Sequence, residues 1–558
     1  MSRDFFFVLH SHIPYVLGHG TWPHGVNWLY EVAAESYIPL IRMFERQAQK
    51  GRRGLSAVSV TPVLAEQLSS NTFRIGFRRY LNERINAAVE DIEYFSSVGN
   101  RKLEDMATYW RDFYSEKLQY FDSIGGDILS RFSYLQDEGV IEIITSAATH
   151  GYLPLLKYDE DVNAQVKKGV ETYERYFNRQ PKGFWLPECA YRPGYKWSPP
   201  VGRGEITNRL GIEEILSKHG IKYFFVDTHL LKGGRAVGTY IDRFEGLRLL
   251  WDRIAKEHEV ESRQLSPYQP YYVASSSVAF FTRDPVTALQ VWSGKHGYPG
   301  DPNYLEFHKK RFPSGLRYWR VTGADVDLGG KDAYDRHKVD NVLNVHADHF
   351  VSLLRDTFKD TDAGVVVAMY DTELFGHWWF EGVQWIEKVF DRVFDYQGIS
   401  ATIPARYIEE NPPVDVVSLP EGSWGEGGFH YVWLNEWTSW VWERIYEAED
   451  VVRQRIPSAE KFYCNMNTKV VFNQMLRELL LLESSDWPFL ITTWSARDYA
   501  ERRAAYHYDN VVKLAKVLDR FDANGVIDQE DMSFCREVLS RDEIFSDVDV
   551  GLWKIEEV

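Results

Sequence analysis

The chain has 558 residues, too many for one minimal domain, which predicts a large barrel with attachments or two to three domains. Its 64 Lys and Arg against 81 Asp and Glu give a formal net charge of -17, which disfavours nucleic acid and anionic membrane surfaces as partners. Its three cysteines are far apart and odd in number, which fits a reducing compartment and excludes a disulfide framework.

The first element is a short apolar run that follows two charged residues, Arg3 and Asp4, and ends before His10. It has no small-residue cleavage site, so we expect a strand and not a signal peptide. No segment approaches the roughly 18 to 20 continuous apolar residues that cross a bilayer. We therefore expect a soluble, cytoplasmic protein without a membrane partner.

Seven short runs of β-branched or aromatic residues are followed by helical pattern, an alternation typical of parallel βα units. The runs are Asp4–Leu9, Leu55–Val60, Ile141–Ser146, Gly183–Leu186, Lys222–Val226, Val278–Phe281 and Gly364–Tyr370. Nearly every run ends in a polar or ionisable residue. Because a βα barrel carries its chemistry on the loops after its strands, this pattern predicts an α/β barrel. An open doubly wound sheet would instead gather its polar residues at one switch point.

Two insertions interrupt the predicted barrel, which we assign to residues 1–405. Residues 62–138 have apolar residues at helical spacing and predict a helical insertion. Residues 231–268 begin with a glycine-rich stretch and continue with a charged one, which indicates a loop or lid over the site. The remaining residues, 406–558, have a mostly helical pattern and predict a helical C-terminal domain.

Two acidic residues, Glu188 and Asp371, follow strands and have aromatic neighbours. Cleavage of a glycosidic bond needs one buried acid that protonates the leaving oxygen and one ionised carboxylate that attacks or stabilises the anomeric carbon. Arg192 is close enough to Glu188 in sequence to favour its ionisation. Either acid alone is more commonly a helix cap, but the pair favours catalysis. Arg283 ends the sixth run, where a buried ion pair is the structural alternative.

His10 and His12 are two residues apart on an extended segment, so both imidazoles point to the same side. Such a pair suits hydrogen bonds to sugar hydroxyls, or a metal shared with Asp227, Asp371 or His150. Satisfaction by neighbours in a polar barrel mouth is the structural alternative. His150 itself lies in a turn-like segment that suits substrate contact better than the core.

Aromatic residues make up 15% of the chain, with 19 Trp, which is more than core packing normally uses. Aromatic rings pack on the apolar faces of sugars while polar neighbours bind the hydroxyls, so this content favours a carbohydrate substrate. For any single Trp, burial in the core is an equally good interpretation.

Four ordered motifs resemble those of glycoside hydrolase family fifty-seven, and most closely its 1,4-α-glucan branching enzymes. The motifs are His10-Ser11-His12-Ile13-Pro14, Thr149-His150-Gly151, Trp185-Leu186-Pro187-Glu188 and Asp371-Thr372-Glu373-Leu374-Phe375-Gly376-His377. The similarity extends over nearly the whole length. It implies a (β/α)7 barrel, in agreement with the seven runs, and a helical C-terminal domain packed against the cleft.

The resemblance also implies the roles of individual residues. Glu188 would be the nucleophile and Asp371 the general acid/base of a retaining reaction that needs no metal and no cofactor. Substrate contacts are implied for His10, His12, Trp22, His150, Tyr240, Arg283, Trp292, Trp424, Trp433 and Asp486. Tyr240 looks like the counterpart of a loop tyrosine that is associated with transfer in branching members.

The acceptor decides among three activities on α-glucans such as amylose, amylopectin or glycogen. Transfer to a 6-hydroxyl forms an α-1,6 branch, attack by water is the reaction of an α-amylase, and transfer to a linear chain is that of a 4-α-glucanotransferase. Exclusion of water from the covalent intermediate decides between transfer and hydrolysis. Two other classes are a metal-dependent deacetylase or mannosidase-like hydrolase that uses His10, His12 and Asp227, and a glucan-binding protein without catalysis.

Overall fold

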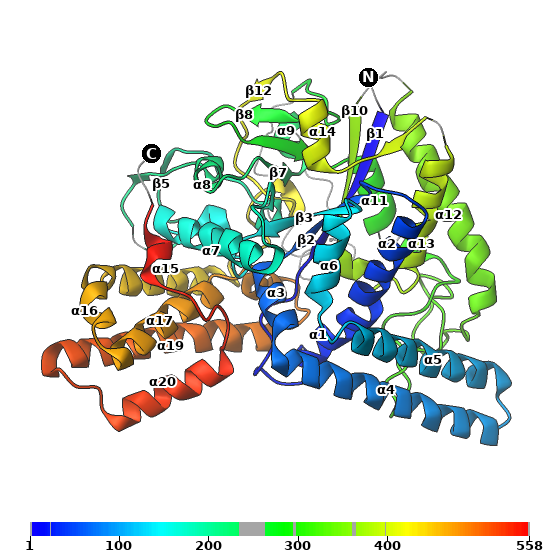
Figure 1. The fold of residues 1–558 in the computed structure, drawn as a ribbon, viewed down its shortest axis with the longest axis horizontal. Helices are drawn as coiled ribbons and strands as arrows, with labels where there is room; N and C mark the ends of the chain where they lie inside the picture. Colours follow the sequence, from blue (N-terminus) through cyan, green and yellow to red (C-terminus); the bar gives the residue numbers. More distant parts are fainter. Residues whose placement is uncertain are drawn as a thin grey trace.

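The centre of the fold is a sheet with seven parallel strands (Figure 1). The computed structural model describes residues 3–22, 24–202, 204–233, 263–293, 297–359, 364–396 and 398–555. In spatial order the seven strands are β10, β1, β2, β3, β4, β7 and β9. Their bounds are β1 Arg3–Ser11, β2 Ser56–Val60, β3 Ile141–Ser146, β4 Gly183–Trp185, β7 Tyr223–Val226, β9 Ala279–Thr282 and β10 Gly364–Asp371. Each of the seven runs predicted from the sequence therefore forms a strand.

The barrel strands are almost entirely buried and mostly apolar. Residues 5–9 of β1 are fully buried, as expected for a parallel strand with a neighbour on each side. β1 pairs with β10 on one side and with β2 on the other, and the register puts His10 opposite both Asp371 and Ser59. The polar residues after the apolar runs therefore meet at one end of the sheet.

The sheet curls until its two ends meet. Just beyond β9, the backbone N–H of Asp284 donates to the carbonyl oxygen of Val367 in β10 at 2.9 Å. The rings of Phe6 in β1 and Phe281 in β9 lie edge to face with centroids 5.3 Å apart, although the two strands are not paired. The predicted (β/α)7 barrel is thus confirmed. Short strands outside it are β5 Lys196–Trp197, β6 Thr207–Asn208, β8 Tyr271–Val273, β11 Ser400–Ala401 and β12 Val416–Val417.

Helices connect the barrel strands and follow the last of them. They are α1 Val26–Val32, the π-helix η1 Ala33–Tyr37, α2 Ile38–Gln49, α7 Asp159–Phe177, α8 Ile212–Lys218, α9 Thr228–Lys232, α11 Pro285–Trp292, α12 Arg336–Thr357, α13 Gly382–Asp395 and α14 Pro404–Glu410. The π-helix continues α1 directly into α2, so one wide turn interrupts an otherwise regular helix. Such turns are frequent at functional sites.

The two predicted insertions differ in how much of them is described. Residues 62–138 contain α3 Pro62–Ser69, α4 Asn71–Ser97, α5 Arg101–Ser123 and α6 Ile128–Asp137. The long helices α4 and α5 lie side by side and project from the barrel (Figure 1). The side chains of Ser70 and Asn100 cap their first turns by accepting backbone N–H groups. In the predicted lid, residues 234–262, with Tyr240, lie outside the described residues.

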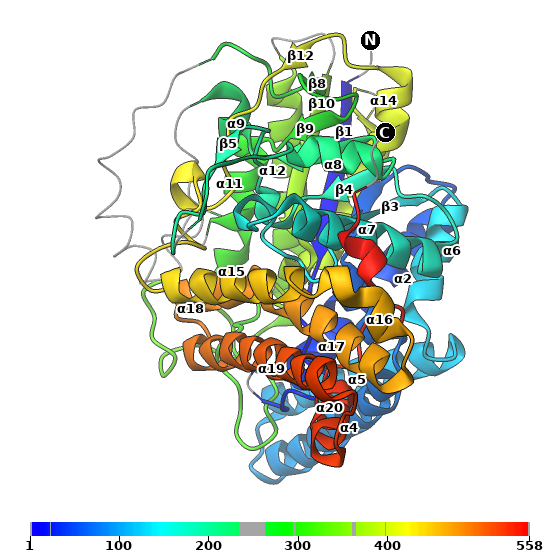
Figure 2. The ribbon, with the colours of Figure 1, turned by 90° about the vertical axis from the view of Figure 1, so that its left-hand side faces the viewer.

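A layer of helices lies beneath the barrel (Figure 2). Its helices are α15 Ser439–Arg453, α16 Ala459–Tyr463, α17 Met466–Leu482, α18 Asp486–Thr492, α19 Arg497–Asn524 and α20 Gln529–Arg541. The first helix of the layer begins at Ser439. α14 spans the predicted boundary at residue 406, and β12 still pairs with β8 beyond it. Among the described residues, no helix is long and apolar enough to cross a membrane.

Candidate active site

The carboxyl-terminal ends of the barrel strands gather the acidic and histidine side chains that the sequence singled out. Asp371 is the last residue of β10 and pairs across the sheet with His10 of β1. Glu188 follows β4, and His150 follows β3. Each of the three residues lies within four positions of the end of its strand, so the strand places its side chain at the barrel mouth.

The backbone at Glu188 has an uncommon conformation. Glu188 and Cys189 have φ values of 60° and 47°, in the left-handed region that non-glycine residues rarely adopt. Two consecutive residues of this kind store strain, which persists only where the surroundings enforce it. Here the N–H of Trp424 donates to the carbonyl oxygen of Glu188 at 3.1 Å, and Tyr191 and Gly422 exchange two backbone hydrogen bonds. The segment from Gly422 to Trp424 therefore holds the turn that presents Glu188.

Each oxygen of the Glu188 carboxylate accepts a hydrogen bond from a neutral group. The indole Nε1 of Trp424 donates to Oε2 at 2.9 Å, and Ser485 Oγ donates to Oε1 at 3.0 Å. Burial raises the pKa of Glu188 to about 7, the Trp424 hydrogen bond opposes this increase, and the negative charge of Asp371 adds to it. The two predicted catalytic carboxyl groups therefore influence each other.

The expectation that Arg192 favours ionisation of Glu188 was wrong. The Arg192 side chain is fully buried and donates to the carbonyl oxygens of Pro154 and Pro193. Proximity in sequence did not predict these contacts, nor the position of the Arg192 guanidinium 3.8 Å from Asp159 Oδ1.

A chain of hydrogen bonds connects two of the predicted histidines to Glu188. Ser59 Oγ lies 3.1 Å from His10 Nδ1, and His10 Nε2 lies 3.0 Å from His150 Nε2. His150 Nδ1 lies 2.8 Å from Ser485 Oγ. Burial lowers the pKa of both His10 and His150 well below the usual value, so both rings are neutral near neutral pH.

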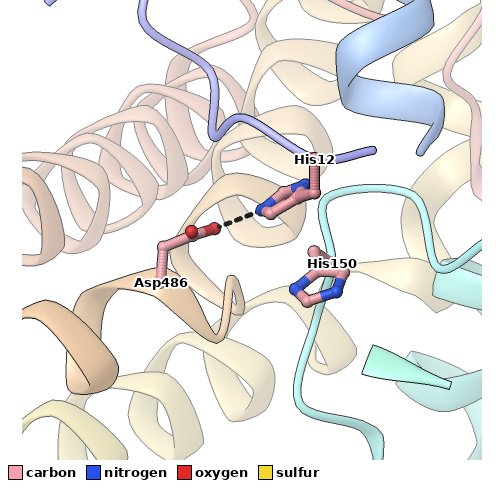
Figure 3. Close-up of side chains that lie close together, drawn as sticks. All are labelled: His12, His150 and Asp486. Carbon is pink, nitrogen blue, oxygen red and sulfur yellow. Dashed lines mark hydrogen bonds and ion pairs between the residues drawn. The ribbon is translucent and has the colours of Figure 1, made fainter. Parts of the chain in front are cut away.

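His12 forms a separate polar pair with Asp486 from the helical layer (Figure 3). His12 Nε2 lies 2.9 Å from Asp486 Oδ2, and His12 Nδ1 lies 3.1 Å from Thr61 Oγ1. Atoms of His12, His150 and Asp486 lie within 4.8 Å of one another, which is close enough to share a metal ion. All of these atoms already have hydrogen-bond partners in the protein.

Arg283 and Asp227 form an ion pair at the ends of β9 and β7. Burial alone would raise the pKa of Asp227, but the guanidinium of Arg283 lowers it well below its usual range. His229 is 3.3 Å from the other oxygen of the same carboxylate. The alternative metal site of His10, His12 and Asp227 is therefore not assembled, since Asp227 is bound by Arg283 and His229. Arg283 also lies over the ring of Trp424, 5.5 Å from its centroid.

The predicted aromatic walls lie in different environments. Trp424 contacts Glu188, as described above, and lies edge to face with Trp185. Trp22 is 77% exposed, whereas Trp292 and Trp433 are each only 1% exposed. Trp433 stacks on Tyr152 with centroids 4.7 Å apart, so core packing already uses that face.

The π-helix supports the segment that follows Asp371. Ser36 Oγ donates to the carbonyl oxygen of Thr372 at 2.9 Å, and the hydroxyl of Tyr37 donates to Glu373 Oε1. The backbone N–H of His12 donates to the same Glu373 oxygen at 3.0 Å. Glu373 thus ties the π-helix to the strand end that carries the histidines.

Four residues at the site were missed by the sequence reasoning: Ser59, Trp185, Glu373 and Ser485. Trp185 stacks on His10 with centroids 4.4 Å apart and fixes the plane of that ring. Trp185 and Glu373 lie inside recognised motifs and could have been found there. Ser59 and Ser485 carry no local signal, because their partners are far away in the sequence.

Comparison with known proteins places these features in context. The model of "Glycosyl hydrolase family 57" matches residues 6–420, and that of "1,4-alpha-glucan branching enzyme, C-terminal" matches residues 446–553. The chain is 41% identical over 554 residues to the 1,4-alpha-glucan branching enzyme TK1436 of Thermococcus kodakarensis, covering 98% of this chain and 78% of that one.

Solved structures agree with the sequence comparison. The crystal structure of TK1436 superposes with a TM-score of 0.88 and covers 99% of this chain and 97% of that chain. The crystal structure of the alpha-amylase AmyC of Thermotoga maritima is 29% identical in sequence and superposes with a TM-score of 0.81. The match covers 100% of this chain and 100% of that chain.

Proposed function

The chain belongs to glycosyl hydrolase family 57, and from that membership we propose that it is a retaining 1,4-α-glucan branching enzyme. It cleaves an α-1,4-glucosidic bond in an α-glucan such as amylose, amylopectin or glycogen and transfers the chain to a 6-hydroxyl. The observation that carries the proposal is the half-buried pair of carboxyl groups at the barrel mouth, Glu188 and Asp371, which interact electrostatically. The match of residues 446–553 to a branching-enzyme C-terminal model favours transfer.

In this proposal the two carboxyl groups have different tasks. Asp371 protonates the bridging oxygen while ionised Glu188 attacks the anomeric carbon, and a covalent glycosyl ester forms. Asp371 then takes the proton of the acceptor hydroxyl, and the ester is broken. The hydrogen bonds from Trp424 and Ser485 support the assignment of Glu188 as nucleophile, because both favour the carboxylate over the acid.

Polar, charged and aromatic side chains around the pair suit a sugar substrate. We assign substrate contact to His10, His12, His150, Arg283, Trp424 and Asp486. Trp292 and Trp433 contribute ring faces only if the cleft rearranges, since both are buried. Trp22 is exposed and suits a distant part of the glucan. Tyr240 and the predicted lid complete the proposal as the elements that exclude water. The three free cysteines fit the proposed cytoplasmic location.

The α-amylase reaction is the second candidate, because AmyC of Thermotoga maritima has the same fold over the full length of this chain. The two activities share their first step and differ in the acceptor. The chemistry of Glu188 and Asp371 is therefore compatible with both.

Linkage analysis of amylose after incubation with the enzyme tests the proposal. We expect new α-1,6 linkages with little release of reducing ends, and no activity in Glu188→Gln, which keeps the size of the side chain but is not a nucleophile. Rapid release of reducing ends without branches would make the protein an amylase. Longer and shorter linear chains would make it a 4-α-glucanotransferase. Loss of activity on exhaustive chelation would instead favour a metal at His12, His150 and Asp486.

A further inference from the structure

Ser485 occupies a position where a serine normally stabilises a helix, but its hydroxyl serves another purpose. It is the residue before the first turn of α18, where serine side chains usually accept a backbone N–H. No such bond is formed here. The side chain is fully buried, and its hydroxyl lies between Glu188 Oε1 at 3.0 Å and His150 Nδ1 at 2.8 Å. Helix capping therefore does not explain this serine.

Counting protons gives the hydrogen-bond chain a direction. A serine hydroxyl has one proton, and that of Ser485 is donated to Glu188. His150 Nδ1 must then carry the proton that it donates to Ser485 Oγ. Because neutral imidazole has one N–H, His150 Nε2 accepts from His10 Nε2. His10 Nδ1 in turn accepts from the hydroxyl of Ser59.

The charged groups around Glu188 show why the hydrogen bond from Ser485 affects its ionisation. The acidic groups that face Glu188 are Asp371 and Asp486, and both oppose its ionisation. The nearest basic group is His150, whose Nδ1 is 3.8 Å away, but burial keeps that ring neutral. His12 is engaged by Asp486, and Arg283 by Asp227. Within the described part of the chain, the hydrogen-bond donors that reach the Glu188 carboxylate are Trp424 and Ser485.

We propose that Ser485 is a positioning residue for the nucleophile: its hydroxyl, oriented by the one-way chain from Ser59 through His10 and His150, holds Glu188 Oε1 and favours the ionised carboxylate. The inference rests on the proposed function, in which Glu188 attacks the substrate. Ser485 keeps its proton throughout and forms no covalent bond. The helical layer thus contributes to the barrel's chemistry through a residue that need not touch the glucan.

The test compares the pH dependence of kcat/KM for the wild type, Ser485→Ala and the matched control Ser56→Ala. Ser56 is also a fully buried serine with a hydrogen-bonded hydroxyl, but it lies at the opposite end of β2. We expect the acidic limb of Ser485→Ala to move up by about one pH unit, since the carboxylate loses one of two donors. Ser56→Ala should keep the wild-type limb.

A second readout isolates the nucleophile from the acid. Labelling of Glu188 by a 5-fluoroglycosyl fluoride needs no protonation of the leaving group, so its pH dependence follows Glu188 alone. We expect the same upward shift in Ser485→Ala, and partial restoration in Ser485→Thr, which retains the hydroxyl. An acidic limb of Ser485→Ala that coincides with the wild type would overturn the proposal. So would an equal shift in Ser56→Ala, because any lost buried hydroxyl would then suffice.

Ser485→Cys covers the case in which the alanine variant does not fold. A thiol fills nearly the same space but is a weak donor, so it should shift the limb in the same direction. An unshifted limb in that variant would also contradict the proposal. Failure of the proposed function is distinguishable, because a wild-type enzyme without transfer or glucan cleavage would have no limb to compare.

Discussion

Two neutral hydrogen-bond donors lower the pKa of the Glu188 carboxyl group, and two negative charges raise it. Burial raises its pKa to about 7, and Asp371 and Asp486 add to the increase, while Trp424 and Ser485 reduce it. The group is therefore half ionised close to neutral pH. In its proposed role as nucleophile, Glu188 would attack at a rate that depends on each of these neighbours.

The pH profile should report this balance. Glu188 must be ionised to attack, so kcat/KM should rise with pH and reach half its plateau near pH 7. Asp486→Asn removes a negative charge and should move this acidic limb to lower pH by a few tenths of a unit to about one unit. That direction is opposite to the one expected for Ser485→Ala, so general loss of structure cannot explain both. An upward shift in Asp486→Asn would contradict this account of the charges.

For individual residues, the sequence predicted the acidic and histidine side chains of the candidate site but not the residues that form hydrogen bonds with them. Motifs identified Glu188, Asp371 and His150 because each follows a strand in a recognisable segment. Ser485 was missed because its role depends on a contact with a carboxylate 297 positions away in the chain. The expected effect of Arg192 failed because its side chain is buried and donates to the carbonyl oxygen of Pro154, a contact between distant parts of the sequence.

Among the elements, the π-helix and the loop after β10 are fitted to each other. Gly376 has a φ of 101°, and a Cβ added there would lie 1.9 Å from the backbone oxygen of Glu35 in the π-helix. Only glycine allows this close approach. The loop that begins at Asp371 is therefore held from outside the barrel by Ser36, Tyr37 and the backbone of Glu35.

Gly376→Ala should push the loop after β10 away from the π-helix, because the added Cβ would clash with the backbone oxygen of Glu35. We expect a loss of about 1 to 3 kcal/mol in the free energy of unfolding and at least a tenfold fall in kcat, because the segment after Asp371 must move. Gly99→Ala is the control, since Gly99 also has a positive φ, 71°, but has nothing within 4 Å of an added Cβ. Denaturant unfolding and kinetics of both variants give the answer. Equal loss of activity in the two variants would refute the fitted contact.

The elements themselves were predictable to different degrees. All seven barrel strands were predicted, because a continuous apolar run followed by a helical pattern can be recognised without knowledge of tertiary contacts. The short strands β8, β11 and β12 have two or three residues each and carry no pattern of their own. The π-helix was not predicted, since its residues have the spacing of an ordinary helix and its wide turn depends on tertiary hydrogen bonds.

For the whole molecule, the helical layer contributes residues to the candidate active site. Ser485 and Asp486 come from the layer, yet they bind Glu188 and His12 of the barrel. We accordingly propose a division of the chain at about Ser439, where the layer begins. The sequence predicted such a domain from residue 406 onward by its helical pattern, whereas residues 416–417 still pair with the sheet.

The three cysteines offer a test of the packing of the whole chain. Cys464 is exposed, while Cys189 and Cys535 are buried, and burial raises the pKa of the Cys189 thiol well above its usual value and that of Cys535 to about 11. We expect a maleimide to label one thiol per native chain near neutral pH, at Cys464, and all three thiols in denaturant. Intact mass and peptide mapping measure this. Labelling of Cys189 as fast as Cys464 would show that the turn at Glu188 is open.

The pairing of β1 with β10 joins residues near the start of the chain to residues 364–371. At a synthesis rate of about 5 to 20 residues per second, β1 waits roughly 20 to 70 seconds on the ribosome for this neighbour. During that time one edge of an apolar strand remains open, and the hydrogen-bond partner of Glu188 at Ser485 does not yet exist. The nascent barrel therefore lacks part of its candidate site and exposes a strand edge that can pair with other chains. Both conditions end only when the last third of the chain has been synthesised.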